Sequence, residues 1–241
     1  MRIAIPKGRL QSSVLATFAA AGYEVPSGNE LLTRRLVFTR GGIEWIFVKD
    51  CDVPVYVEHG AADVGIAGLD QILEHACSAY QPVELPYGRC RMMVIGARGA
   101  PPLSNGARIA TKYPRIARQY LDSRALHAEV IPLGGSVELA AVLQLTSHVI
   151  DLVESGETVR VHQLELQDFV TEIAPRLIVA KNVYRINHQE IRALIARIET
   201  ACHPERSEGP VRAGRDAWVS QPHPSPGSLA TARDDTGRND V

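Results

Sequence analysis

Short apolar runs alternate with glycine-rich or polar turns and with amphipathic stretches along most of the chain. Short apolar runs bounded by turn signals predict buried strands, and apolar positions three or four residues apart predict helices. The predicted strands are 2–5, 36–40, 43–48, 62–68, 83–87, 91–95, 108–111, 127–133, 149–153 and 176–180. The predicted helices are 10–21, 53–59, one opening at 69–70, 114–120, 137–145 and 188–201. This alternation is typical of an α/β protein.

The first strand runs into a basic glycine turn, Pro6-Lys7-Gly8-Arg9, and then into a helix. Ligands of open α/β sheets dock at the carboxyl ends of the strands, so Lys7 and Arg9 are candidates for binding a phosphate there. Solvated turn residues are an equally good reading of the same pattern.

The stretch 36–48 reads as a hairpin, because Gly41-Gly42 separates two strand-like runs. Arg34 and Lys49 belong to a locally basic region around it, which either faces solvent or lines a cleft. Asp70 opens the helix after strand 62–68, where it can hydrogen-bond a substrate or simply favour the first helical turn through its charge.

The stretch DLVESGETVR, residues 151–160, is the most informative part of the sequence. A buried strand, expected to be parallel to its neighbours, ends there in an acidic turn centred on Gly156. Backbone N–H groups, Ser155 and Thr158 are suited to binding an anion, whereas Asp151 and Glu154 would repel a polyphosphate placed directly against them. A phosphorylated ribose would suit both the acidic residues and the anion-binding turn. The carboxylates of Asp151 and Glu154 would accept hydrogen bonds from its diol or hold magnesium, and the turn would bind its phosphate. A plain helix cap at Ser155 or Thr158 is the alternative.

Composition narrows the class of protein. The chain has 241 residues, 45% of them hydrophobic, and a formal net charge of -1. Two α/β lobes fit this size, and the charge gives no general attraction to nucleic acid or to a membrane surface. No secretory leader or membrane-length apolar run is visible, so we expect a cytoplasmic protein. The four cysteines lack metal-site spacing and are expected to be reduced. Residues 203–241 lack periodicity and are predicted to form a disordered tail.

Six stretches occur in the order found in one enzyme family: RIAIPKGRL, DVPVYVEHGAADVGIAGLD, GRCRMMV, IATKYPRIARQY, LGGSVELA and DLVESGETVR. Because of these six stretches, the chain resembles the ATP phosphoribosyltransferases of histidine biosynthesis. The resemblance covers roughly residues 1 to 200. The resemblance departs from the family pattern at Lys49, where the family usually has arginine, and at Leu69, where it often has a basic residue.

The resemblance implies two lobes similar to type II periplasmic binding proteins, with the active site in the cleft between them. Lobe one would be residues 1–91 plus 176–202, and lobe two residues 92–175. The reaction would move 5-phosphoribosyl from phosphoribosyl pyrophosphate to N1 of ATP, with Mg²⁺ present and pyrophosphate released. The chain resembles the short form, which works in a hetero-oligomer with a regulatory subunit resembling histidyl-tRNA synthetase.

The resemblance also suggests roles for the candidate residues. Asp151, Glu154, Lys49 and Arg34 would be catalytic. Residues binding phosphoribosyl pyrophosphate would be Asp151, Glu154, Ser155, Gly156, Glu157 and Thr158. Residues binding ATP or pyrophosphate would be Lys7, Gly8, Arg9 and Asp70. Two rivals remain at this point, a non-catalytic solute-binding protein and a phosphoribosyltransferase acting on another base.

Overall fold

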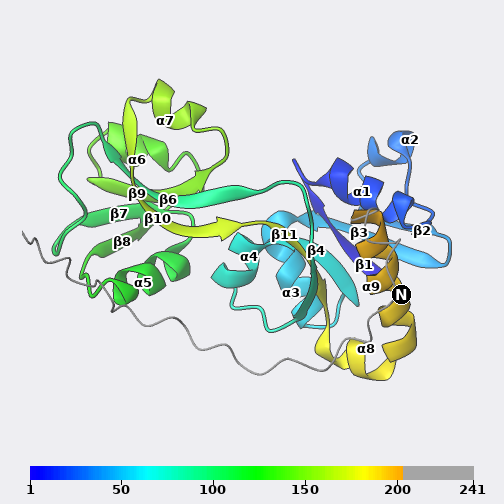
Figure 1. Ribbon diagram of the computed structural model, residues 1–241. Helices are drawn as coiled ribbons and strands as arrows, with labels where there is room; N and C mark the ends of the chain where they lie inside the picture. The colour runs from blue at the N-terminus through cyan, green and yellow to red at the C-terminus, as the bar shows by residue number, and fades with distance from the viewer. Residues whose placement is uncertain (203–241) are drawn as a thin grey trace, which may run out of the picture. The chain divides into compact units, whose positions relative to one another are not determined.

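The computed structural model describes residues 1–202. The tail predicted at 203–241 lies outside the described residues. Two β-sheets organise this part of the chain, and Figure 1 shows both with their helices. We call them sheet A, in the order β2-β3-β1-β4-β11-β5, and sheet B, in the order β10-β6-β9-β7-β8.

Sheet A, with the helices packed on it, forms lobe one. Its strands are β1 (Arg2–Lys7), β2 (Val37–Arg40), β3 (Ile43–Lys49), β4 (Val64–Gly68), β5 (Tyr80–Glu84) and β11 (Pro175–Val179). Its helices are α1 (Gln11–Ala20), α2 (Gly28–Leu31), η1 (Asp50–Asp52), α3 (Val53–Glu58), α4 (Leu69–Glu74), α8 (Lys181–Ile186) and α9 (His188–Cys202). Strand β1 lies parallel to both β3 and β4, so three carboxyl ends meet at one edge.

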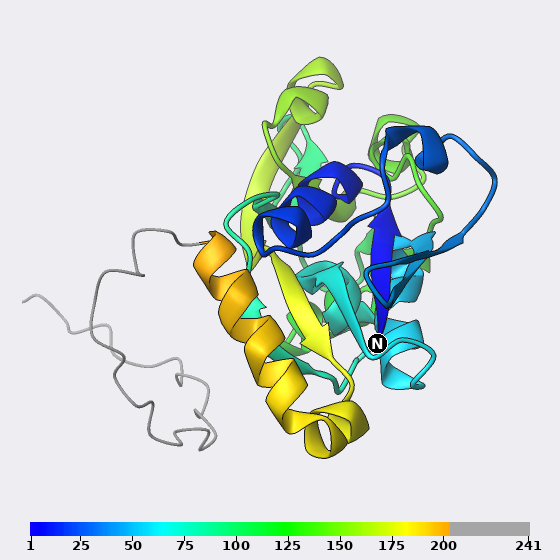
Figure 2. The ribbon, with the colours of Figure 1, turned by 90° about the vertical axis from the view of Figure 1, so that its right-hand side faces the viewer.

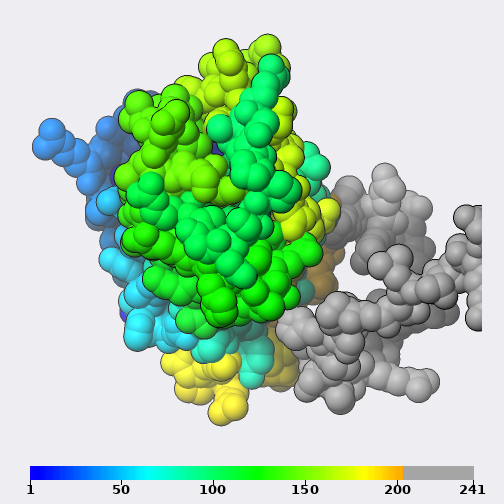
Figure 3. Space-filling view, turned by 90° about the vertical axis from the view of Figure 1, so that its left-hand side faces the viewer, coloured from blue at the N-terminus to red at the C-terminus, as the bar shows by residue number. Residues whose placement is uncertain are grey.

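Sheet B forms lobe two. Its strands are β6 (Cys90–Ala97), β7 (Arg108–Thr111), β8 (Glu129–Pro132), β9 (His148–Val153) and β10 (Leu164–Ile173), and its helices are α5 (Pro114–Ser123), α6 (Glu138–Val142) and α7 (Glu157–Val161). Figure 3 looks onto the surface that these residues, drawn mainly in green, present. The chain passes from sheet A to sheet B between β5 and β6, and returns between β10 and β11. The exact division of the chain into domains stays a prediction.

Each lobe has an apolar core of its own. In lobe one, Phe18 and Trp45 pack edge to face with ring centroids 5.2 Å apart. The apolar side chains of α9, among them Leu194, join the same core, and Figure 2 shows α9 in orange beside β11. In lobe two, Met92, Ile109 and Ile150 are fully buried. Burial of these side chains fixes the strands whose ends carry the polar residues discussed below.

Most predicted elements are confirmed in position. The hairpin turns at Gly41 and Gly42, both in the left-handed region with φ of +55° and +75°. Helix α1 is followed by Gly22 at φ +80°, as expected of a helix terminator.

Several predictions were wrong in detail. The strand expected at 83–87 is β5, which ends at Glu84, and the helix expected at 137–145 spans only Glu138–Val142. Strand β9 is parallel to β7 but antiparallel to β6, so it is not part of an all-parallel sheet. The segment 97–105 was expected to be an inter-lobe connection or a loop, and the second interpretation is confirmed: after Ala97, the last residue of β6, it forms a loop within lobe two. Helix α8 and strand β10 were not predicted.

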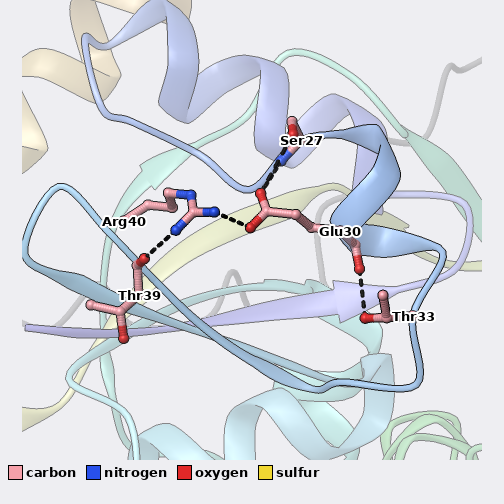
Figure 4. Close-up of polar contacts among 5 residues, drawn as sticks. All are labelled: Ser27, Glu30, Thr33, Thr39 and Arg40. Carbon is pink, nitrogen blue, oxygen red and sulfur yellow. Dashed lines mark hydrogen bonds and ion pairs between the residues drawn. The ribbon is translucent and has the colours of Figure 1, made fainter.

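Glu30 fixes the basic loop between α2 and β2. Its carboxylate accepts the Ser27 backbone N–H at 3.0 Å and pairs with the Arg40 guanidinium of β2, as Figure 4 shows. Thr33 donates its hydroxyl to the Glu30 carbonyl at 2.7 Å. The loop that carries Arg34 is therefore anchored on both sides.

Candidate active site between the two lobes

A cavity of about 270 Å³ lies between the lobes and is lined by residues of both. Its lining residues are Pro6, Lys7, Gly8, Arg9, Leu10, Asp50, Gly68, Asp70, Gln71, Gly88, Lys112, Tyr113, Leu152, Ile173 and Pro175. The set includes the carboxyl end of β1, the start of α4 and both chain crossings between the sheets. It is a strongly polar cavity, with three cationic side chains and two carboxylates.

The turn after β1 supplies the first group of polar residues. Lys7 is the last residue of β1 and pairs in register with Lys49, the last residue of β3. Both lysines are exposed. Gly8 adopts φ +108°, which a residue with a side chain rarely does, and nothing lies within 4 Å of the place a Cβ would occupy. The strand edge therefore presents two neighbouring cations beside an open turn.

Arg9 joins the two lobes through an ion pair. Its Nη1 lies 2.8 Å from Oε2 of Glu154, the residue that follows β9. Its Nη2 lies 3.8 Å from Sγ of Cys90. Both charged side chains are about half exposed or more, at 52% for Arg9 and 63% for Glu154, so the pair is accessible to a ligand.

Asp70 is buried at the start of α4 and bonded to the other lobe. Its Oδ2 accepts the Tyr113 hydroxyl at 3.0 Å and the Gln71 side-chain amide at 2.8 Å. Burial, followed by the nearby Asp70 charge and this hydrogen bond, raises the pKa of Tyr113 above its usual range. Tyr113 therefore stays protonated and acts as a donor to Asp70.

Asp151 lies within β9, mostly shielded from water. Its Oδ1 accepts the Leu152 backbone N–H at 2.8 Å. Burial raises the pKa of the Asp151 carboxyl; the Leu152 N–H opposes this rise, the Glu138 charge adds to it and the Lys112 charge reduces it. Asp151 is thus a desolvated carboxyl with a lysine nearby that favours its ionised form.

Within the described part of the chain, the turn after β9 leaves several backbone N–H groups without a protein acceptor. Gly156 adopts φ +75° and is the N-cap of α7. The Glu157 N–H contacts the Ser155 hydroxyl at 3.3 Å, and among the described residues the N–H groups of Gly156, Thr158 and Val159 have no protein acceptor. Ser155, Glu157 and Thr158 are exposed. The N–H groups are therefore available to a ligand.

A second cavity, of about 470 Å³, contains Glu154 and lies against the chain crossings. Its lining residues are Leu69, Glu84, Arg89, Cys90, Arg91, Val153, Glu154, Thr171, Glu172, Ile173, Ala174 and Arg176. Ile173 lines both cavities, so the two are adjacent.

Five of the twelve predicted site residues line the two adjacent cavities. Lys7, Gly8, Arg9 and Asp70 line the first cavity, and the Arg9–Glu154 pair connects them to the acidic turn. Lys49 stands beside Lys7 on the sheet edge. The other predicted residues line neither cavity: Arg34, Lys49, Asp151, Ser155, Gly156, Glu157 and Thr158.

Lys112 and Tyr113 line the cavity but were not singled out from the sequence. They follow β7, which lies parallel to β9 in the same sheet. Since the carboxyl ends of parallel strands share an edge, the position of the acidic turn after β9 could have pointed to them.

Comparison with known proteins agrees with this geometry. The ATP phosphoribosyltransferase family model matches residues 49–200. The ATP phosphoribosyltransferase of Teredinibacter turnerae is 39% identical over 204 residues, which cover 83% of this chain and 95% of the relative. The chain belongs to the ATP phosphoribosyltransferase family. The resemblance seen in its six motifs is therefore confirmed.

Solved structures support the same family and fold. The ATP phosphoribosyl transferase (HisG:HisZ) complex from Thermotoga maritima contains a chain with a TM-score of 0.76 and 31% identity, covering 85% of this chain and 99% of that one. The periplasmic aliphatic sulphonate binding protein SsuA from Escherichia coli has a TM-score of 0.55 at 14% identity, covering 86% and 74%. At that identity only the fold is shared. The predicted α/β fold of two lobes similar to periplasmic binding proteins is confirmed.

Two further observations concern metals and membranes. Among residues 1–202, no three His, Cys, Asp or Glu side chains are grouped so that they could hold a metal ion by themselves. None of the helices described is both long enough and apolar enough to cross a membrane.

Proposed function

We propose that this protein transfers 5-phosphoribosyl from phosphoribosyl pyrophosphate to N1 of ATP and releases pyrophosphate, the first step of L-histidine biosynthesis. The observation that carries the proposal is 39% identity across 95% of an ATP phosphoribosyltransferase. The polar cavity between the lobes, next to the acidic turn, is where we place the reaction. The lobes we assign are 1–91 plus 176–202 and 92–175; the strands themselves change sheet one or two residues earlier, at Cys90 (β6) and Pro175 (β11).

The acidic turn would bind the ribosyl donor. Breaking the bond from C1 to pyrophosphate gives the ribose ring positive character, and the carboxylates of Asp151 and Glu154 would stabilise it. The same oxygens can accept hydrogen bonds from the ribose diol. The free N–H groups around Gly156 and the Thr158 hydroxyl would hold the 5-phosphate and orient the sugar.

Cations of lobe one would receive the anionic groups. Lys7 and Lys49 lie side by side at the sheet edge, and Arg9 is already paired with Glu154. We assign Lys7, Gly8, Arg9 and Asp70 to ATP and pyrophosphate, and Lys49 and Arg34 to stabilising charge on the departing pyrophosphate. N1 of adenine has a free lone pair and needs no strong general base.

Arg9 and Glu154 would change partners when substrate binds. In the structure, each charge neutralises the other across the lobes. A ribose that hydrogen-bonds Glu154 and a pyrophosphate that contacts Arg9 would replace this pair with two new interactions. The binding of the donor is therefore expected to depend on both residues together.

Magnesium would come with the donor. Mg²⁺ is commonly held by one or two carboxylates, waters and substrate phosphates, so a group of three protein ligands is not required. Asp151 and Glu154 fit that donor set, and the metal would neutralise charge on the pyrophosphate. The chain's own residues would hold the sugar and the anions in place.

We also propose that the chain acts in the cytoplasm in a hetero-oligomer with a regulatory subunit. The support is the similarity to a chain of the HisG:HisZ complex, which covers 99% of that chain. The partner would resemble histidyl-tRNA synthetase and carry the response to histidine. A purified chain that is active and inhibited by histidine by itself would contradict this part of the proposal.

The experiment is incubation of the purified chain with phosphoribosyl pyrophosphate, ATP and Mg²⁺, with and without the regulatory subunit. Formation of the N1 adduct would be followed by absorbance, and pyrophosphate by a coupled assay. Replacing ATP with other nucleobases and nucleotides tests for a different acceptor. A solute-binding protein would bind ligand but form no adduct under either condition, and that result would overturn the proposal.

A further inference from the structure

Helix α4 of lobe one contacts lobe two through two carboxylates one helical turn apart. Asp70 and Glu74 are at positions i and i+4, so they lie on the same face of the helix. Asp70 accepts the Tyr113 hydroxyl at 3.0 Å. Glu74 is half-buried and reaches the first turn of α5.

Helix α5 begins without a cap of its own. Tyr113 occupies the N-cap position and makes no side-chain cap hydrogen bond, and Pro114 follows it in the first turn. The next two backbone N–H groups donate to Glu74 instead. The Arg115 N–H lies 3.0 Å from Oε1 and 3.1 Å from Oε2, and the Ile116 N–H lies 3.1 Å from Oε2. The cap of a lobe-two helix is therefore supplied by lobe one.

This cap adjoins the cavity. Lys112 and Tyr113 line it and immediately precede the capped turn, whereas Glu74 does not line it. A carboxylate at a helix N-terminus satisfies unpaired N–H groups and also complements the helix dipole. By accepting the Arg115 and Ile116 N–H groups, Glu74 therefore fixes Lys112 and Tyr113 relative to the cationic side chains of lobe one.

We propose that Glu74 is a positioning residue: by capping α5 across the lobe boundary, it holds Lys112 and Tyr113 in the geometry that binds the nucleotide. The inference rests on the proposed function, since it takes ATP as the occupant of the cavity. Without Glu74, α4 keeps the Asp70–Tyr113 bond and the packing of Leu69 and Leu73 against lobe two, but the first turn of α5 loses the acceptor of its Arg115 and Ile116 N–H groups.

The test compares Glu74→Ala with Glu58→Ala. Glu58 is a matched control, because its carboxylate also accepts a backbone N–H, that of Ser78 at 3.0 Å, but within lobe one. Both variants lose a carboxylate that accepts a main-chain hydrogen bond. Hydrogen exchange of the 113–120 segment reports the cap directly. Calorimetry with ATP alone and steady-state kinetics, with the regulatory subunit present, report nucleotide binding.

We expect faster exchange at Arg115 and Ile116, and about 5-fold to 30-fold weaker ATP binding, in Glu74→Ala alone. The KM for ATP should rise by a similar factor while kcat changes little. Glu74→Gln keeps one acceptor oxygen and should restore part of the affinity.

Unchanged exchange in Glu74→Ala would overturn the cap, and faster exchange with wild-type ATP affinity would overturn the positioning role. Equal losses of affinity in Glu58→Ala would also overturn it, because the effect would then be one of general stability. If the wild-type chain formed no adduct, the proposed function would be rejected instead. Adduct formation is measured in a separate assay, so the two outcomes can be distinguished.

Discussion

The Arg9 guanidinium and the Glu154 carboxylate lie 2.8 Å apart and form an ion pair between the two lobes. The two residues are 145 positions apart in the chain. Each of the two is a proposed substrate-binding residue, from opposite sides of the cavity region. The pair is substantially exposed, so it contributes little to the stability of the fold. Its importance is therefore expected in substrate binding and turnover.

Glu154→Gln is expected to lower kcat by roughly 100-fold, because it removes a charge that stabilises the ribosyl transition state without removing bulk. The free energy of unfolding should change by less than about 1 kcal/mol. Adduct formation and thermal unfolding measure the two effects. Glu165→Gln is the control, since Glu165 forms an exposed pair with Arg98 within lobe two at 3.4 Å. An equal loss of kcat in that control would contradict the assigned role.

Thr158→Val is expected to weaken binding of phosphoribosyl pyrophosphate by about 1 to 3 kcal/mol, the value of a hydrogen bond to a charged group. The side chain is exposed, so the fold should be unaffected. Calorimetric titration with the donor measures the change. Thr39→Val, on an exposed position of β2, is the comparison. Donor affinity unchanged in Thr158→Val would remove the phosphate assignment.

Gly156→Ala tests the shape of the same turn. A Cβ at this position would meet only Val153 Cγ1, at an ordinary 3.9 Å, so the cost comes from the backbone at φ +75°. That conformation costs an alanine about 1 to 2 kcal/mol, and the turn is expected to relax away from it. Donor affinity should fall by about 5-fold to 30-fold.

Gly135→Ala provides the control for that change. Gly135 also precedes a helix of lobe two, has no positive φ and has open space around the Cβ position. Its substitution should leave donor affinity and stability near wild type. If both variants bind the donor normally, the turn at Gly156 does not hold the phosphate.

The sequence predicted local features well. The hairpin at Gly41-Gly42 and strand β1 were recoverable because their signals, a glycine pair and a short apolar run, are local. The acidic turn was likewise visible, since a strand, a glycine and hydroxyl residues follow one another directly. These features depend on residues within a few positions of each other.

Strand β10 was missed because its pattern does not show which face is buried. Of its ten residues, only the first and last are buried, and its register with β6 shifts twice. It is an edge strand held by pairing with β6, not by an apolar run of its own. The Arg9–Glu154 pair and the Glu74 cap were equally invisible, because they depend on how the two lobes meet.

Tyr113→Phe is expected to destabilise the fold by about 1.5 to 3 kcal/mol, because the buried Asp70 loses a donor. The matched control is Tyr120→Phe, since the Tyr120 hydroxyl donates to Asp168 at 2.6 Å within lobe two. Both variants should lose stability in chemical denaturation. Only Tyr113→Phe should also raise the KM for ATP, because the Tyr113 hydroxyl bonds to the other lobe beside the cavity and the Tyr120 hydroxyl does not. A raised KM in both variants would contradict this.

Asp151→Asn is expected to stabilise the fold at neutral pH while abolishing most activity. Burial raises the pKa of this carboxyl above its ordinary value, so ionisation costs the folded state more than the unfolded state. Below about pH 3 the carboxyl is protonated in both states and the cost is absent. As the pH rises through the folded-state pKa, the wild type loses stability that the asparagine variant keeps, because the amide oxygen can still accept the Leu152 N–H. Thermal unfolding of both proteins between pH 4 and 8 measures the difference, which should grow with pH and then level off. A difference independent of pH would show that the fold leaves the pKa of Asp151 unshifted, and one of opposite sign would show that the fold stabilises the carboxylate; either result would contradict the prediction.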